Sequence, residues 1–548
     1  MSLLSALSSH HLPVHIHLLP AFLHRTMATK TYRDAVDHLN SLQSNAATLE
    51  AVRASGGRLS EFAIPEMIEY LARIGYSPSD LNKLNVIHIT GTKGKGSTSA
   101  FTDSILRAHR PDWKVGLYTS PHLVAVRERI RINGAPIDES SFVKYFYEVW
   151  DSLQQNTRTA NPQTPIMPGY FRFMTLLAYH TFLQLKVDAT VLEVGVGGRY
   201  DSTNVVPKPI LTGITALGID HVSILGKTLK DIAWQKAGIF KVRAYPTHIL
   251  RQTNTISYYQ EGVPALTVEQ PEEAMPVLKE QAEILKASEF EVLSPTPGLS
   301  NIKLGLAGGH QYQNANLAVV LAKRFLTPQN GQIFDEGLPE TFVEGLKATK
   351  WPGRCQTVVD PSREQTTWFL DGAHTLESLD CCVKWYVSPE IALRSPESFG
   401  ERSKVLIFNC TNGRTGNAFL GAMLACATKQ LAKHGRTEGA GALFNQVIFC
   451  ANVTYADGNF KGDLTTKALS DADLLHLKTQ HELADAWSSL LPSYPKDNIH
   501  VLPSIEHAVN VVRKLEASSE KPLDILVAGS LHLVGGVIDV AGLSHVAL

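Results

Sequence analysis

The sequence predicts an α/β protein with two domains, and three observations support this fold class. The chain has 548 residues, which is more than one hydrophobic core usually organises. A β-branched run, a glycine-rich loop and a helical segment follow one another between Val86 and Arg107, as in a βαβ unit. Beyond about residue 354, strand-like runs again alternate with helical segments, so a second α/β domain is expected.

Composition narrows the classes of function. Hydrophobic residues make up 44% of the chain, charged residues 19%, and the formal net charge is -1. This balance gives no bulk attraction to nucleic acid or to membranes, and no apolar run is long enough for a spanning helix. We expect no nucleic-acid partner and no integral membrane segment, and leave peripheral association with an inner membrane open.

The cysteines indicate a reducing compartment. All six lie in the C-terminal part of the chain and form no CxxC pair. Neither a zinc site nor a disulfide framework is therefore predicted.

The first 26 residues differ from the rest of the chain. They contain no acidic residue, are rich in Ser, Leu and His, and carry one late arginine, Arg25. This composition resembles a mitochondrial presequence, so we interpret residues 1–26 as a targeting segment. Met27 follows directly, and we expect a matrix form initiated at Met1 and a cytosolic form initiated at Met27. A disordered tail without an address is the competing interpretation.

The stretch VIHITGTKGKGSTSAF, residues 86–101, predicts a phosphate-binding loop between a buried strand and an amphipathic helix. Its glycines let backbone N–H groups surround an anion at the positive end of the helix dipole. Its lysine can reach a β- or γ-phosphate, and a hydroxyl can bind magnesium. A glycine-rich connection without a ligand is the competing interpretation. The candidate nucleotide-binding residues are Gly94, Lys95, Gly96 and Ser97.

Turns and linkers divide the remaining sequence. A boundary is expected near residues 347–354, which separates a first domain, 27–348, from a second, 349–548. Residues 245–297 look like variable sequence, and residues 388–403 like a surface insertion. The other elements expected in the first domain are a strand at 114–119, a helix ending near Trp150, a helix at 170–185, strands at 189–194 and 210–217, and a helix at 314–325. In the second domain, strands are expected within TTWFLDGAH, KVLIFNCTNGR, NQVIFCANV and DILVAGSLHLVGG.

Eight motifs in both domains together resemble one family. In order they are HITGTKGKGSTSA, TSPHL, LEVGVGGRYDSTN, GIDHVSILG, WQKAGIF, GHQYQNA, WPGR and LDGAH. Their order resembles the folylpolyglutamate synthases, relatives of the bacterial Mur ligases, over the chain from about Tyr32 to its end. The resemblance implies a P-loop ATPase domain like the Mur ligase central domain, followed by a Rossmann-like domain. It implies ATP-driven joining of L-glutamate to the γ-carboxyl of a tetrahydrofolate or folylpolyglutamate.

The chemistry of that reaction explains the residue types. A carboxylate is not attacked by an amine until phosphorylation gives it a leaving group, so an acyl phosphate must form away from water. Lys95 and the loop amides are expected to orient ATP and stabilise the transferring phosphoryl group. Magnesium is the expected metal, and the resemblance also allows K⁺ or another monovalent cation.

Three polar residues follow strands of the first domain. Glu193 closes a buried strand, Ser120 follows the strand at 114–119, and His221 follows the strand at 210–217. Strand ends of an α/β sheet face its ligand crevice. The resemblance implies that these residues bind magnesium, although histidine is an unusual partner for this ion. The competing interpretations are a helix cap, a turn hydroxyl and a satisfied loop histidine, respectively.

Lys236 lies on a segment that Thr228 could cap as a helix. In the family that the motifs resemble, the corresponding lysine is carbamylated by carbon dioxide, which turns an ammonium into an anionic oxygen ligand. Partial burial would favour this by lowering the pKa of the amine. The competing interpretation is a surface lysine paired with a carboxylate such as Asp231.

The second domain is expected to bind both ATP and glutamate. The resemblance implies that Arg354 and Asp371 contact ATP, with Gln311 and Asn314 of the first domain near the adenine. His374 is a candidate for holding the incoming glutamate. Arg414 follows a strand, where its planar guanidinium suits a glutamate carboxylate, unless it is simply solvated.

Folate needs an aromatic or apolar wall and cations for its glutamate tail. By resemblance, the candidate contacts lie in GYFRF and RYDS, namely Phe171, Arg172, Asp201 and Ser202. Arg127, Arg129 and Arg131 alternate with other residues, which predicts a strand with one solvated face and, second, a surface for the tail.

The residues leave more than one enzyme open. Dihydrofolate synthase, or a bifunctional enzyme, would accept dihydropteroate instead. A P-loop switch or binding protein without ligase chemistry is the interpretation from another class. A monomer is expected for a cleft enzyme of this size.

Overall fold

The computed structural model describes residues 30–43, 62–241, 262–330, 337–395, 400–410, 416–458, 462–464, 476–519 and 521–548. The expected presequence, the Met27 start and the predicted glutamate ligand Arg414 lie outside these ranges. Within them, no helix combines the length and apolar character needed to cross a bilayer.

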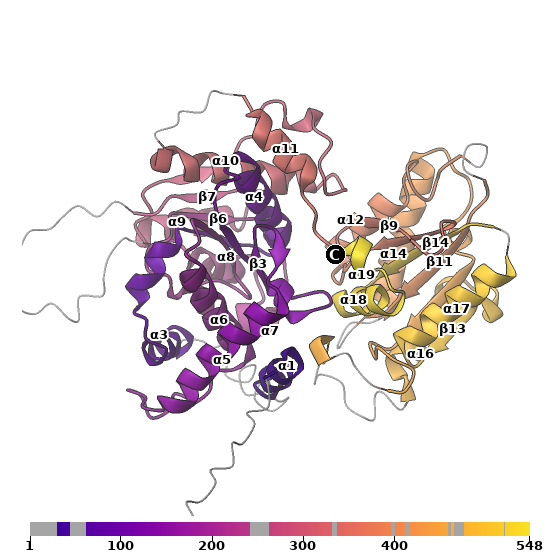
Figure 1. The fold of residues 1–548 in the computed structure, drawn as a ribbon. Coiled ribbons are helices and arrows are strands. Elements are labelled where there is room, and N and C mark those ends of the chain that lie inside the picture. The colour runs from indigo at the N-terminus through magenta and orange to yellow at the C-terminus, as the bar shows by residue number, and fades with distance from the viewer. Residues whose placement is uncertain are drawn as a thin grey trace, which may run out of the picture.

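Two separate sheets confirm the α/β fold class (Figure 1). The first has the order β4-β3-β2-β5-β1-β6-β7-β8, and the second the order β13-β12-β11-β14-β10-β9. The strands of the first sheet are β1 (Val86–Thr90), β2 (Val115–Tyr118), β3 (Ile130–Ile132), β4 (Ala135–Pro136), β5 (Ala189–Glu193), β6 (Leu211–Ile214), β7 (Ala265–Thr267) and β8 (Phe290–Val292). Those of the second are β9 (Gln356–Val359), β10 (Thr366–Leu370), β11 (Ser403–Phe408), β12 (Gln446–Cys450), β13 (Ile499–Leu502) and β14 (Leu523–Ala528).

The first sheet brings its functional strand ends to one edge. Strands β2, β5, β1 and β6 run parallel, with Ile89 opposite Glu193 and Thr90 opposite Ile214. Only β3 and β4 run antiparallel, at one side of this described sheet. The loops that follow the four parallel strands therefore meet at the same carboxyl edge.

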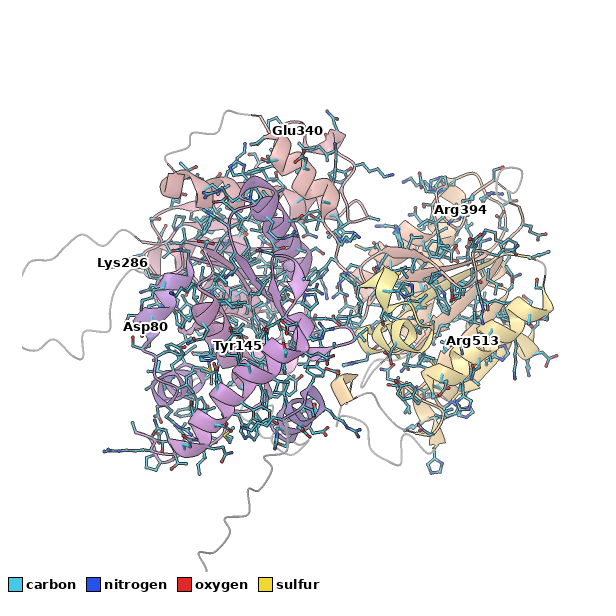
Figure 2. The ribbon with its side chains drawn as sticks, in the orientation of Figure 1. Asp80, Tyr145, Lys286, Glu340, Arg394 and Arg513 are labelled. Atoms are coloured by element: carbon cyan, nitrogen blue, oxygen red, sulfur yellow. The ribbon has the colours of Figure 1, made fainter. Side chains whose placement is uncertain are left out.

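Helices cover both faces of the first sheet, with side chains drawn between the layers in Figure 2, and Tyr145 is one of the buried side chains of this core. One face packs against α1 (Tyr32–Ser41), α3 (Ala63–Arg73), α5 (Glu139–Gln155) and α6 (Tyr170–Leu185). The other packs against α4 (Lys95–His109), α10 (Gln311–Asn330) and α11 (Glu340–Ala348). Near β6 and β7 lie α8 (Leu229–Ala237) and α9 (Met275–Ile284), and the short α7 (Val222–Leu225) contacts α8. Because helices cover both faces, every residue of β1 and β5 is buried, including the polar His88 and Glu193.

The second sheet is covered in the same way. One face packs against α12 (Leu376–Tyr386), α14 (Gly416–Lys433) and α16 (Lys478–Leu490). The other packs against α17 (Ile505–Ser518), α18 (Leu531–Val540) and α19 (Ser544–Ala547). Its strands are parallel except β9, which pairs antiparallel with β10.

The first half of the molecule is the part of the chain through α11, and the second half is the part from β9 onward. A loop of the first half is buried in the core of the second half. Leu123 and Val124 belong to the same buried apolar cluster as Trp368 and Val534 of the second half. A Cβ on Gly353 would lie only 3.2 Å from the Leu123 side chain. The chain that follows β2 thus joins the two halves directly.

Two predictions from the sequence are corrected here. The strand expected over Arg127, Arg129 and Arg131 is wrong for its first part, because Val126–Arg129 forms a 3₁₀ turn and β3 begins at Ile130. The solvated face is also wrong, since Arg129 and Arg131 are buried. The sequence taken as variable, residues 245–297, contains β7, α9 and β8 in its described part.

Candidate active site

The glycine-rich loop forms the turn that the sequence predicts. Gly94, with φ of 88°, precedes α4, and no side chain caps the start of that helix. A first helical turn without a cap leaves its N–H groups for a bound anion. The amides of Thr92 and Lys93 instead bond the carbonyl of Ala216, each at 3.0 Å, which ties the loop to the chain after β6. Gly94, Lys95, Gly96 and Ser97 therefore lie where a phosphate group would bind.

Two lysines share one carbonyl at this loop. Lys95 Nζ donates to the carbonyl of Gly91 at 3.1 Å, and Lys236 Nζ donates to the same oxygen at 2.7 Å. Burial lowers the pKa of both, and the neighbouring Lys95 lowers that of Lys236 further, to well below its ordinary value. The interpretation of Lys236 as a surface lysine paired with Asp231 is wrong, because the side chain is 3% exposed. Asp231 instead caps α8 together with Thr228.

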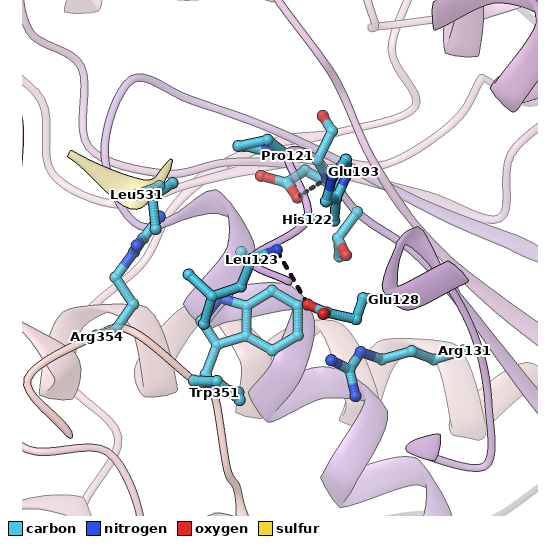
Figure 3. Close-up of a pocket in the computed structure, with 13 residues that line it drawn as sticks. Pro121, His122, Leu123, Glu128, Arg131, Glu193, Trp351, Arg354 and Leu531 are labelled. Carbon is cyan, nitrogen blue, oxygen red and sulfur yellow. Dashed lines mark hydrogen bonds between the residues drawn. The ribbon is translucent and has the colours of Figure 1, made fainter. Parts of the chain in front are cut away.

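Ser120 and Glu193 meet at the sheet edge. The Ser120 N–H donates to Glu193 Oε2 at 3.0 Å, and burial raises the pKa of the glutamate despite the attraction of Lys95. Both residues line an open cavity of about 50 Å³ between the two halves (Figure 3). Its lining comprises Gly96, Thr119, Ser120, Pro121, His122, Leu123, Glu128, Arg131, Glu193, Trp351, Pro352, Arg354 and Leu531.

His221 begins α7 at the same edge. Its backbone adopts a left-handed conformation, with φ of 49°, and its N–H donates to Asp220 Oδ1 at 2.9 Å. The residue is solvent-exposed, and partial desolvation, followed by the nearby lysines Lys95 and Lys236, lowers the pKa of its imidazole, which favours the neutral form that a metal ligand needs. Asp220 also accepts Lys93 Nζ at 3.1 Å. Although burial opposes it, Lys93 and His221 hold the pKa of Asp220 at about 2.

These residues fit a magnesium ion that is held partly by phosphate oxygens. Among the described residues, no three His, Cys, Asp or Glu side chains form a ready-made metal cluster. Magnesium commonly takes only one or two protein oxygens and completes its shell with phosphate and water. The carboxylate of Glu193 and the hydroxyl of Ser120, at one cavity, match that donor set.

The GHQYQNA segment lies against the phosphate loop. A Cβ on Gly94 would fall 2.0 Å from Asn314 Oδ1, so the close approach of α10 requires glycine there. Asn314 donates to Gln311 Oε1 at 2.9 Å, and Gln311 donates to the Ser97 hydroxyl at 3.4 Å. The structure thus brings Asn314 and Gln311 to the loop itself.

The second half contributes a turn around Asp371. Its two carboxylate oxygens accept the N–H groups of Cys355 at 2.7 Å and Ala373 at 2.8 Å. These bonds hold Arg354 and His374 on either side of one acid. Arg354 lines the cavity, whereas the His374 ring bonds the carbonyl of Gly372 at 2.8 Å.

The four candidate folate residues have different surroundings in the structure. The Phe171 ring packs on the glycine-rich strand end, where a Cβ on Gly195 would lie 2.4 Å from it. Arg172 forms an ion pair with Glu66. Asp201 accepts bonds from Val196 N–H at 3.0 Å and from the Thr203 hydroxyl at 2.6 Å, so its carboxylate stabilises its own loop. Ser202, the next residue, is also buried, at the start of a 3₁₀ turn.

His122, Arg131 and Trp351 are among the lining residues that sequence reasoning did not assign to the site. His122 and Trp351 stand inside the quoted motifs TSPHL and WPGR, so their position was a usable signal. Arg131 was noted only as part of an alternating basic run. Its guanidinium stacks over Trp351 at 5.5 Å, which no local pattern shows.

Comparisons with known proteins agree with this geometry. Folylpolyglutamate synthase from Saccharomyces cerevisiae strain AWRI796 is 43% identical over 526 residues, which cover 93% of this chain and 87% of the relative. Among solved structures, Mycobacterium tuberculosis folylpolyglutamate synthase complexed with ADP matches with a TM-score of 0.65 at 22% identity, over 93% of this chain and 98% of that one. E. coli FolC in complex with DHPP and ADP matches with a TM-score of 0.60 at 20% identity, over 94% and 99%. No family model matches the chain.

The two α/β halves, joined at a cavity beside the glycine-rich loop, have the Mur ligase fold. The similarity to the curated relatives makes the chain an ATP-dependent ligase of that fold. The 43% sequence identity to the yeast enzyme extends over 93% of this chain, which narrows the class to one family. The chain belongs to the folylpolyglutamate synthase family, as the order of its motifs predicts.

Proposed function

We propose that this chain joins L-glutamate to the γ-carboxyl of tetrahydrofolate or a folylpolyglutamate, with ATP as the energy source. In the first step, a γ-carboxylate oxygen attacks the terminal phosphorus of ATP, and ADP leaves with the electrons of the broken P–O bond. In the second, the amine nitrogen of glutamate attacks the acyl carbon and phosphate leaves, while the nitrogen loses a proton to solvent. Longer folate chains would keep the product inside the cell and the mitochondrion.

The observation that carries the proposal is the convergence of Lys95 and Lys236 on the carbonyl of Gly91, close to Glu193. Lys95 and the amides at the start of α4 bind and orient the phosphates, and burial strengthens that attraction. Magnesium would be held by Ser120, Glu193 and His221, where it would neutralise charge on the phosphates. K⁺ or another monovalent cation is a further candidate at this site.

We assign carbamylation to Lys236. Its pKa is lowered by burial and by Lys95, so the neutral amine persists to lower pH than in a free lysine. The neutral nitrogen attacks the carbon of CO₂, an N–C bond forms as one C=O π electron pair moves onto oxygen, and the proton lost from nitrogen passes to water. As pH falls, the amine becomes protonated and the carbamate is lost.

Labelled bicarbonate tests this assignment. Protein equilibrated with ¹³C-bicarbonate should give a carbamate ¹³C resonance that disappears in Lys236→Met and on acidification. Lys241→Met is the matched control, because Lys241 is half-buried and desolvation lowers its pKa to about 8. A resonance lost in Lys241→Met but kept in Lys236→Met would contradict the assignment.

The substrate contacts follow from position. Phe171 offers an aromatic wall for the pterin, and Arg172, Asp201 and Ser202 are proposed to lie beside it. His374 and Arg414 are proposed to hold the incoming glutamate, while Arg354 and Asp371 serve ATP. The enzyme is proposed to act as a monomer.

Two products from one message are proposed, one initiated at Met1 for the mitochondrial matrix and one at Met27 for the cytoplasm. Subcellular fractionation with detection of both products tests the proposal, and it also tests peripheral attachment to the inner membrane. The first described helix begins at Tyr32, so a product starting at Met27 retains it. A single product in one compartment would contradict the proposal.

Phosphate release tests the reaction itself. Purified protein is mixed with ATP, tetrahydrofolate and labelled glutamate, and each substrate is omitted in turn. Release that requires both the folate and glutamate, with label in the product, is expected. Phosphate release that continues at the same rate without folate, or without glutamate, would refute the proposed ligase reaction. A parallel assay with dihydropteroate separates dihydrofolate synthase or a bifunctional enzyme from the preferred activity.

A further inference from the structure

A three-residue segment of the second half contacts the first half at several points. Gly462–Leu464 lies between α1 and α18, as the short light-orange piece in Figure 1. The carboxylate of Asp463 accepts the Tyr32 hydroxyl at 2.7 Å and the Val126 N–H at 2.8 Å, both at Oδ1. Asn40 Nδ2 donates to the neighbouring carbonyl of Gly462 at 2.8 Å.

The backbone of the same residue reaches the cavity lining. The carbonyl of Asp463 bonds His122 Nε2 at 2.6 Å, and Arg129 Nε donates to the other ring nitrogen at 2.9 Å. These two bonds define the tautomer, with the proton on Nε2. His122 stands two residues after Ser120, whose N–H bonds Glu193. The contact with Asp463 therefore ends close to the metal-binding edge proposed above.

The first-half partners of Asp463 are held firmly. The Tyr32 ring packs edge-on against Phe142 with centroids 5.4 Å apart, and burial, followed by Asp463, raises the pKa of its hydroxyl. The hydroxyl therefore remains a donor at any physiological pH. The Val126 N–H begins the 3₁₀ turn that continues from the buried Leu123 and Val124.

We infer that Asp463 is a positioning residue, which holds the second half on the loop behind Ser120 so that Arg354 and the Ser120–Glu193 pair share one cavity. The role rests on the proposed function for its effect on turnover, but the hydrogen bonds exist without it. The bonding partners of Asp463 are Tyr32, Val126 and His122, none of which is assigned to ATP or folate. Its carboxylate acts through Tyr32 and Val126, while its backbone carbonyl bonds His122 whatever the side chain.

The test compares Asp463→Ala with Asp463→Asn. Alanine removes the acceptor of Tyr32 and Val126, whereas asparagine keeps one carbonyl oxygen that can receive both. We expect kcat to fall about five- to tenfold in the alanine variant, as for the loss of one or two net hydrogen bonds. The asparagine variant should recover most of that loss. The KM for ATP should change by less than about twofold, because the phosphate loop keeps its own contacts.

A double-mutant cycle with Tyr32→Phe isolates the contact. The Tyr32→Phe change should add nothing to Asp463→Ala, since both remove the same bond. Tyr455→Phe is the matched control, because the Tyr455 hydroxyl donates to Asp539 Oδ2 at 2.8 Å within the second half. Its effect should add to that of Asp463→Ala. Additive behaviour of Tyr32→Phe, or unchanged kcat in Asp463→Ala, would overturn the inference.

Hydrogen exchange separates this role from the proposed reaction. The peptide containing residues 121–129 should exchange faster in Asp463→Ala than in wild type, and at the wild-type rate in Tyr455→Phe. Unchanged exchange in Asp463→Ala would overturn the inference even if the protein is an active ligase. Faster exchange in a protein without ligase activity would refute the proposed function and leave the interdomain contact standing.

Discussion

Two carboxylates end buried strands in the two sheets, and their surroundings differ. Glu193, the last residue of β5, lines the cavity, and burial raises its pKa beside Lys95. Asp371 follows β10 and accepts backbone N–H groups on both of its oxygens. A carboxylate at the end of a strand can therefore face a bound ligand, or it can stabilise the turn that carries other ligand-binding residues. The first sheet supplies the charged edge, and the second holds Arg354 in place.

Glu193→Gln should have the largest effect on activity. Glutamine keeps an oxygen for the Ser120 N–H but loses the charge that faces the phosphate loop. We expect kcat to fall about 10²- to 10³-fold, as for removal of one preorganised electrostatic contact. Glu148→Gln is the control, because Glu148 bonds His180 at the surface. A loss in kcat smaller than about threefold would mean that the Glu193 carboxylate, like that of Asp371, supports local structure and does not act on the phosphates.

Asp371→Ala should act on stability as well as on activity. It leaves the N–H groups of Cys355 and Ala373 without their acceptor, which costs about 2–4 kcal/mol in the free energy of unfolding. Displacement of Arg354 should lower kcat/KM for ATP about tenfold. Asp371→Asn keeps one acceptor oxygen and should be milder. Equal denaturation midpoints for wild type and Asp371→Ala would contradict a turn-building role.

Lys93→Met should have a smaller effect at the first edge. It removes the ion pair with Asp220 and one positive charge from the loop. We expect a KM for ATP raised about two- to fivefold and a stability change below about 1 kcal/mol. Lys83→Met, which breaks the exposed Lys83–Asp80 pair at 2.8 Å, should leave the KM unchanged. Equal KM values for ATP in the two variants would show that Lys93 does not contribute to ATP binding.

Thr228→Ala should have the smallest effect on turnover. It removes the capping box of α8, the helix that carries Lys236, and should cost about 1 kcal/mol of stability. Thr375→Ala does the same to α12 in the second half. Chemical denaturation followed in both halves should give one shared transition in each variant. Separate transitions would show that the two sheets unfold independently.

The sequence predicted what depends on local spacing. The phosphate loop, the strand before Glu193 and the Thr228 cap each follow from a few neighbouring residues, and the structure contains all three. The ordered motifs then predicted the family. The burial of Lys236 could not be predicted from its neighbours in sequence, because its amine bonds the carbonyl of Gly91, 145 residues away.

Other features have no local signature. The short strands β7 and β8 each span three residues, too few for a periodic pattern. The alternation of Arg127, Arg129 and Arg131 was misleading because a 3₁₀ turn interrupts it. The bond between Tyr32 and Asp463 joins residues 431 positions apart, so only the folded chain reveals it.

The burial of Leu123 and Val124 in the second half limits how this enzyme can be divided. A fragment cut near the boundary would expose two aliphatic side chains directly behind Ser120. Such a fragment would tend to associate with itself, and its serine would lose the support that fixes the loop. Attempts to express the nucleotide-binding half by itself, or to exchange halves between relatives, must therefore redesign these two positions first.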